Sequence, residues 1–191
     1  MNTTTQSPSE IVSKLGLSLE SSSPLGGVDE DWPRIAYQCR LVRNGREVWY
    51  GPYKLGIGHV KLVDPYKLGH ASAWSMHLSE EEKNILSAMA KRPGVQFKDK
   101  AVKIQARACA KLAIAQKVTP KLADVLHSLL LDGSAHFDSQ TFEDWCADFG
   151  YSDNSIKARD TFETCERIGK AIARAFSRDE LAELREAFSN Y

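Results

Sequence analysis

The sequence is poor in cysteine and contains no long hydrophobic run. Only four of its 191 residues are cysteines, none in a Cys-x-x-Cys pair, which excludes a disulfide scaffold and favours reduced, mostly buried thiols. The uninterrupted apolar runs, such as residues 129–131, are far shorter than the ~20 residues that cross a bilayer. Residues 1–9 are polar and lack the basic and apolar regions of a secretory signal. We therefore expect a cytoplasmic protein with no membrane partner.

An excess of one charge is also absent from the chain as a whole. The 25 Lys and Arg residues balance 25 Asp and Glu residues, which argues against a uniformly acidic nucleic-acid mimic and against a DNA-coating protein. The balance hides a local asymmetry, because residues 91–121 hold nine basic residues and one acidic residue. Residues 122–191 instead hold seven basic and 14 acidic residues. Since 42% of the residues are hydrophobic and 26% are charged, the composition is that of a folded globular protein.

A β-hairpin is the most strongly indicated β element. In residues 35–42, apolar side chains recur at every second position from Ile35 to Leu41, as in a half-buried strand. Asn44 and Gly45 follow, and both tolerate the positive φ that a two-residue hairpin turn requires. Residues 47–50 then form the returning strand. The segment from Glu20 to Asp31 is rich in Ser, Pro and Gly, and we interpret it as a linker or surface loop.

Helical signals dominate the rest of the chain. A Ser followed by Glu three residues later, which is the capping box of a helix start, occurs at Ser7, Ser79 and Ser177. Apolar residues three and four positions apart predict four further helices. These cover residues 99–116, 119–133, 138–150 and 153–176. The apolar stripe of the last one comprises Ile156, Phe162, Cys165, Gly169, Ile172 and Phe176.

The predicted fold class is therefore α+β, with a small antiparallel sheet built on an N-terminal β-hairpin and followed by a mostly helical bundle. We divide the chain into an N-terminal helix and hairpin (1–58), a basic, partly helical insertion (59–118) and a C-terminal helical region (119–191). The first and last of these are expected to form one compact unit. The sequence PYKLG at residues 52–56 recurs at residues 65–69, but two copies are too few for a repeat architecture.

Four cations of the basic segment share one face of the helix expected there. Lys100, Lys103, Arg107 and Lys111 are three, four and four residues apart, which places them within about 80° of arc on an α-helix. Such a stripe suits the phosphates of nucleic acid, an acidic protein surface, or the acidic helices of the same chain. An ordinary solvated helix face is the simplest alternative.

Aromatic and basic side chains alternate in and after the hairpin. Such an arrangement can stack nucleic-acid bases or form a protein interface. It can also reflect a sheet with one buried face and one solvent-exposed face. Trp49 and Tyr53 are the candidate interface residues. The set comprises Trp49, Tyr50, Tyr53, Tyr66, Arg40, Arg43, Arg46, Lys54 and Lys67.

No group of histidines matches a metal-binding pattern. His59, His70 and His77 fall within nineteen residues, but no cysteine lies nearby and the spacing fits no zinc signature. Residues 56–59 resemble a glycine-rich phosphate loop only superficially, because the Gly-Lys-Ser/Thr ending is missing. We therefore expect no metal and no cofactor.

Two cysteines are weak candidates for a catalytic nucleophile. Cys146 and Cys165 can be paired with His127 or His136 as a general base, yet both lie at apolar helical positions where structural thiols are usual. The carboxylates near residues 143 and 179 lie at helix starts, where the helix dipole favours them. The sequence therefore does not predict an enzyme.

The two ends of the chain resemble small accessory proteins encoded by bacteriophages and prophages. The resemblance rests on residues 123–133 (ADVLHSLLLDG) and 141–155 (TFEDWCADFGYSDNS), and continues into the final helix. The hairpin, led by Asp31-Trp32, extends it to about residues 8–58 and 119–190. Residues 60–118 are an insertion relative to shorter members. The family provides no catalytic motif that transfers to this chain.

This resemblance implies an accessory protein of a mobile element, located in the cytoplasm of a bacterial host cell. Because small phage proteins without enzymatic motifs often disable host machinery, the first hypothesis is a non-catalytic inhibitor of a host defence complex, most simply a CRISPR–Cas effector. The basic stripe would contact RNA, DNA or an acidic subunit, or the acidic C-terminal helices would occupy a cationic DNA channel. The alternative is a nucleic-acid-binding accessory protein that uses residues 91–121.

Overall fold

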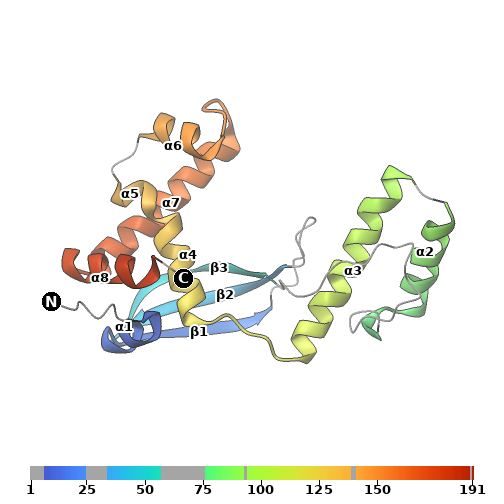
Figure 1. Ribbon diagram of the computed structural model, residues 1–191, viewed down its shortest axis with the longest axis horizontal. Helices are drawn as coiled ribbons and strands as arrows, with labels where there is room; N and C mark the ends of the chain where they lie inside the picture. Colours follow the sequence, from blue (N-terminus) through green and yellow to red (C-terminus); the bar gives the residue numbers. More distant parts are fainter. Residues whose placement is uncertain (1–6, 25–33, 57–75, 93, 139–140, 190) are drawn as a thin grey trace. The chain divides into compact units, whose positions relative to one another are not determined.

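The structure, a computed structural model, describes residues 7–24, 34–56, 76–92, 94–138, 141–189 and 191 (Figure 1). The described residues form three strands and eight helices, which confirms the predicted α+β fold class. The chain divides into two compact units. Unit 1 comprises residues 1–20, 39–51 and 121–191, and unit 2 comprises residues 21–38 and 52–120.

The three strands form one antiparallel sheet in the order β1-β2-β3. The strands are β1 (Leu17–Pro24), β2 (Arg34–Arg43) and β3 (Arg46–Gly56). The predicted hairpin between β2 and β3 is confirmed, because Asn44 and Gly45 have φ values of 47° and 79°. The predicted alternation is also present, since every second residue of β2 from Ile35 to Leu41 is buried.

The interpretation of residues 20–31 as a loop is wrong for its first part, because residues 20–24 belong to β1. A strand at the edge of a sheet is held mainly by backbone hydrogen bonds to its one neighbour, so serines are compatible with it. Leu17 anchors the start of β1 in the interior, and Glu20 forms an ion pair with Arg40 of β2 at 3.3 Å. The rest of the predicted loop, residues 25–31, lies outside the described residues.

Six helices belong to unit 1, and α7 is central among them (Figure 1). Helix α7 contacts α4, α5 and α6, while α1 contacts α4 and α8. Its core includes fully buried Leu126, Ile172 and Leu184. The helices are α1 (Pro8–Lys14), α4 (Leu122–Asp132), α5 (Ser134–Phe137), α6 (Phe142–Phe149), α7 (Ile156–Ala175) and α8 (Arg178–Phe188).

Three of these helices begin later than predicted, and a capping side chain marks the start of two of them. Helix α4 begins at Leu122, after Lys121, two residues beyond the Thr-Pro pair. Helix α6 begins after Thr141, whose hydroxyl accepts the backbone N–H of Asp144, and α7 begins after Ser155, which caps in the same way. The sequence did not predict the four-residue helix α5.

In unit 2, α2 (Glu80–Lys91) packs against α3 (Val95–Ala115). The predicted capping box at Ser79 and Glu82 is confirmed, and α3 begins four residues before the predicted start. The first PYKLG copy lies in β3, whereas the second lies outside the described residues. The buried cluster between the two helices comprises Leu78, Leu86, Met89, Ala101, Ile104, Ala108 and Cys109.

Candidate functional site

The four predicted cations of α3 are all exposed and lie along one face of the helix. Alanine recurs in α3 and has the highest intrinsic helix propensity, so residues 95–115 form a regular helix despite their many charges. The opposite arc is buried, with Ala101 and Cys109 packed towards α2, and Ile104 is buried beside the stripe. We call Lys100, Lys103, Arg107 and Lys111 the α3 stripe.

The α3 stripe is about 16 Å long, because eleven residues separate its ends at about 1.5 Å each. At one end, Lys111 Nζ lies 3.8 Å from Glu82 Oε2 of α2, a distance typical of a weak ion pair. Glu82 is itself occupied, since it accepts the Ser79 backbone N–H at 2.9 Å. Within the described residues, neither Lys100 nor Arg107 forms an ion pair. Lys100 and Arg107 therefore contribute positive charge that no ion pair among the described residues neutralises.

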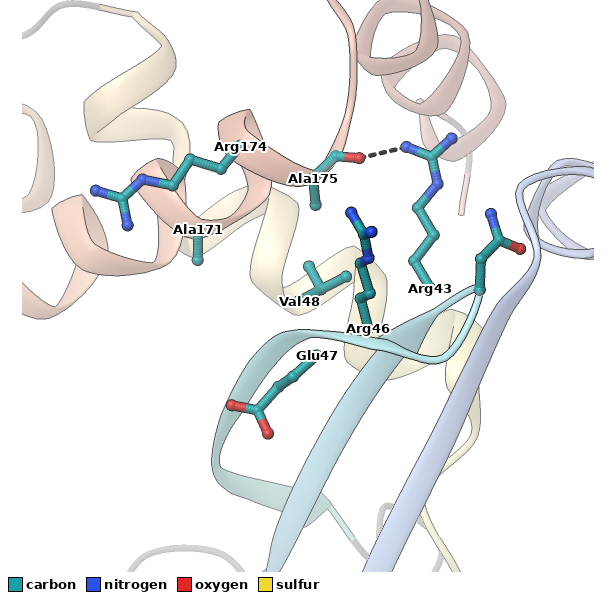
Figure 2. A pocket seen from close by; sticks show the side chains of 8 residues that line it. Arg43, Arg46, Glu47, Val48, Ala171, Arg174 and Ala175 are labelled. Atoms are coloured by element: carbon teal, nitrogen blue, oxygen red, sulfur yellow. Dashed lines mark hydrogen bonds between the residues drawn. The ribbon is translucent and has the colours of Figure 1, made fainter.

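A second group of cations lines a pocket of about 620 Å³ in unit 1 (Figure 2). Arg43 and Arg46 extend from the hairpin, and Arg174 extends from α7. This pocket was only partly predictable, because the basic residues of the hairpin are close together in the chain but Arg174 lies far from them. The remaining lining residues are Asn44, Glu47, Val48, Ala171 and Ala175.

Arg43 acts as a clamp between the hairpin and the junction of α7 and α8. Its guanidinium donates to the backbone carbonyl of Ala175 and to Glu180 Oε1 at 2.5 Å, and it lies 4.9 Å from the ring centre of Phe176. The carbonyl groups at the end of a helix carry partial negative charge, which attracts cations and opposes anions. We therefore assign Arg43 a structural role, and the α3 stripe is the better candidate for binding an anionic partner.

The Arg43 guanidinium lowers the pKa of Glu180 to about 2, and the backbone N–H of Ser177 adds to the effect. Both groups donate hydrogen bonds that favour the carboxylate over the protonated acid. Glu180 also completes the capping box of α8, so one carboxylate joins the helix start to the hairpin. Because the pKa is lower in the folded state, the resulting stabilisation is present above pH ~4.5 and is lost as the pH falls towards ~2.

We expect the stability difference between the wild type and Glu180→Gln to shrink as the pH is lowered from 5 to 2. The full pKa shift corresponds to about 3 kcal/mol, and the 28% exposure of the side chain reduces this to on the order of 1–2 kcal/mol. Urea unfolding at several pH values measures the difference. Glu186→Gln is the matched control on α8, because Glu186 has no side-chain ion pair with a described residue. A difference that does not depend on pH would contradict the coupling to Arg43.

The two aromatic residues predicted to form an interface in the hairpin are less exposed than an interface role would lead one to expect. Trp49 and Tyr53 are both half-buried. The Trp49 ring lies over the backbone of Gly51, so close that a β-carbon on Gly51 would be 2.5 Å from it. Tyr50 is the exposed aromatic side chain here, at 61%. Trp49 therefore covers the backbone of Gly51, and Tyr50 is more exposed to a partner than Trp49.

Cys146 and Cys165 belong to a buried cluster with Trp145, and burial raises the pKa of the Cys165 thiol to about 11. Such thiols are poor nucleophiles at neutral pH. His127, one of the bases considered for them, instead stacks on the ring of Phe188. His136, the other, packs closely against Gly169 of α7.

The histidine group of the sequence is largely outside the described residues. His59 and His70 lie there, and His77 is half-buried. In the part of the chain that the structure describes, no three His, Cys, Asp or Glu residues are grouped as metal ligands. Its helices include none with the length and apolar character needed to cross a bilayer. Comparisons of the chain with protein-family models, with curated proteins and with solved structures found no match, so its function has to be inferred from its own surfaces.

Proposed function

We propose that the protein is a non-catalytic binding protein that engages nucleic acid through the α3 stripe. The observation that carries the proposal is the exposure of four aligned cations on a helix whose opposite arc is buried. A helix anchored in this way presents its charges on a rigid element, so little backbone conformational entropy is lost on binding.

The dimensions of the stripe suit a phosphate backbone. Each strand of a duplex carries one phosphate per ~3.4 Å of helix axis, so the ~16 Å stripe faces about five of them. Lysine and arginine contacts to phosphates carry little sequence information, so we expect binding with weak sequence preference. With three or four phosphates neutralised, the logarithm of the affinity should fall with the logarithm of the salt concentration with a slope of about −3 to −4.

We expect the double variant Lys103→Glu/Arg107→Glu to lose at least about 30-fold in affinity for nucleic acid at low salt, because two attractive contacts become repulsive. The salt slope should become less steep by about 2. Fluorescence anisotropy with a labelled 20-base-pair DNA duplex and a 20-nucleotide RNA, at several salt concentrations, measures both quantities.

The matched control is Lys83→Glu/Lys157→Glu, which changes the net charge by the same amount at exposed lysines of α2 and α7. This control should retain most of the affinity, and circular dichroism checks that both variants fold. Absence of binding by the wild type at low salt, or equal losses in the two double variants, would contradict the proposal.

A second function follows from the resemblance to phage accessory proteins: inhibition of a host defence complex, with a CRISPR–Cas effector as the first candidate. The observation that favours it is the contrast between the basic segment 91–121 and the acidic segment 122–191, which offers surfaces for both components of a nucleoprotein. Pull-down from a bacterial lysate with and without nuclease separates the two functions. A nuclease-resistant effector complex favours inhibition, whereas capture that nuclease abolishes favours nucleic-acid binding alone.

A further inference from the structure

Three large apolar side chains are exposed where α6 turns into α7. Phe149, Tyr151 and Ile156 are exposed at 55%, 37% and 81%, and they lie within eight residues of one another in the chain. This turn is at the end of α7 away from α8 (Figure 1). Ile156 was expected in the buried stripe of its helix, and that expectation is wrong because α7 begins there and leaves its first residue in solvent. Isolated exposed apolar residues are ordinary, but such a local concentration is typical of interaction surfaces.

The core holds two of these side chains in place. The ring of buried Trp145 stacks on Tyr151, with ring centres 4.9 Å apart, and lies 5.2 Å from the ring of Phe149. Gly150, with φ of 69°, ends α6 and allows the Tyr151 backbone N–H to donate to the backbone carbonyl of Cys146 at 2.9 Å. The aromatic rings are therefore preorganised, which lowers the entropic cost of binding a partner. We call Phe149, Tyr151 and Ile156 the α6–α7 patch.

The surroundings of the patch are acidic. Residues 141–163 contain six acidic and two basic residues, and Asp148, Asp153 and Asp160 are all exposed. Burial raises the pKa of the Cys146 thiol, and the negative charge of Asp153 raises it further. A surface that combines apolar side chains with carboxylates repels nucleic acid and anionic lipid headgroups, and favours positively charged protein surfaces.

We infer that the α6–α7 patch is a docking surface for a cationic protein, whose Arg and Lys residues surround an apolar pocket that receives Ile156 and the aromatic rings. Tyrosine and phenylalanine are enriched at the centres of protein interfaces, and charge complementarity around them sets the choice of partner. This inference is independent of the nucleic-acid proposal, because the patch lies in unit 1 and the α3 stripe lies in unit 2.

Site-specific photo-crosslinking tests the inference. A benzoylphenylalanine is placed at position 156 of the full-length chain, and at position 131 as control, because Leu131 is also an exposed apolar residue of unit 1, at 59%. Both proteins are irradiated in nuclease-treated bacterial lysate, and the cross-linked peptides are identified by mass spectrometry. We expect cross-links from position 156, and not from position 131, to peptides rich in Arg and Lys of another protein.

Binding measurements with the purified partner then separate the apolar contribution of Ile156 from the electrostatic contribution of the surrounding carboxylates. We expect Ile156→Ser and Asp153→Lys/Asp160→Lys each to weaken binding at least tenfold, and Leu131→Ser to leave it unchanged. These variants alter exposed side chains, so folding should be retained and is checked by circular dichroism. Cross-links only to a second copy of this chain, cross-links to an acidic protein, equal labelling from position 131, or no labelling above background would each overturn the inference.

Discussion

Gly169→Ala is expected to destabilise the protein by about 2–3 kcal/mol, although the same change in an ordinary helix stabilises it by about 1 kcal/mol. A β-carbon on Gly169 of α7 would lie 2.4 Å from the β-carbon of His136 and 2.8 Å from the carbonyl oxygen of Gly133. Neither neighbour moves easily, because the Gly133 carbonyl accepts the backbone N–H of His136 at 3.1 Å and the Gly133 N–H donates to Leu129 at 2.9 Å. The two helices must therefore separate. Urea unfolding followed by circular dichroism measures the loss.

Ala173→Gly is the matched control one turn further along α7, where the residue is exposed. There we expect the ordinary helix preference, with a loss of about 1 kcal/mol on going from alanine to glycine. The opposite signs at the two positions distinguish steric exclusion from helix propensity. A Gly169→Ala variant as stable as the wild type would show that α5 and α7 do not approach closely at this point.

Arg43→Ala is expected to reduce the free energy of unfolding by about 2–4 kcal/mol. The change removes charge-assisted hydrogen bonds to Glu180, the bond to the Ala175 carbonyl and the contact with the Phe176 ring. It also leaves the half-buried carboxylate of Glu180 without its cation, which adds to the loss. A double-mutant cycle with Glu180→Gln should give a coupling energy of about 1–2 kcal/mol.

Arg46→Ala provides the control from the same pocket. Arg46 is exposed and forms no ion pair with a residue that the structure describes, so its removal should change stability by less than about 0.5 kcal/mol. Similar losses for Arg43→Ala and Arg46→Ala would mean that the positive charge of the pocket, rather than the clamp, is what matters for stability.

Features that depend on a few neighbouring residues were predictable from the sequence. The capping boxes at Ser7, Ser79 and Ser177 are all present, because a serine hydroxyl and a glutamate three residues later satisfy the free backbone N–H groups of a helix start locally. The turn at Asn44 and Gly45 follows from the same kind of local constraint.

Elements that depend on distant partners were missed. Strand β1 has a serine-rich sequence typical of a loop, and it is a strand because β2 offers it an edge to pair with. Helix α5 is too short for periodicity to reveal it, and its packing against α7 holds it in place. Ile156 fits the apolar period of α7, but none of the described elements covers its position at the start of the helix, where it is 81% exposed.

The candidate functional surfaces also combine features that local sequence predicts with features that depend on distant contacts. Helical periodicity is enough to align Lys100, Lys103, Arg107 and Lys111, so the α3 stripe could be predicted before any contact was known. Local turn and capping chemistry was likewise enough to predict the α+β class. The exposure of the stripe, the packing of Trp49 over its own strand and the pairing of Arg43 with Glu180 became evident from the folded protein alone. Exposure and ion pairing depend on which distant segments come together in space. The side-chain period of a helix, by contrast, depends only on residues that are neighbours in the sequence.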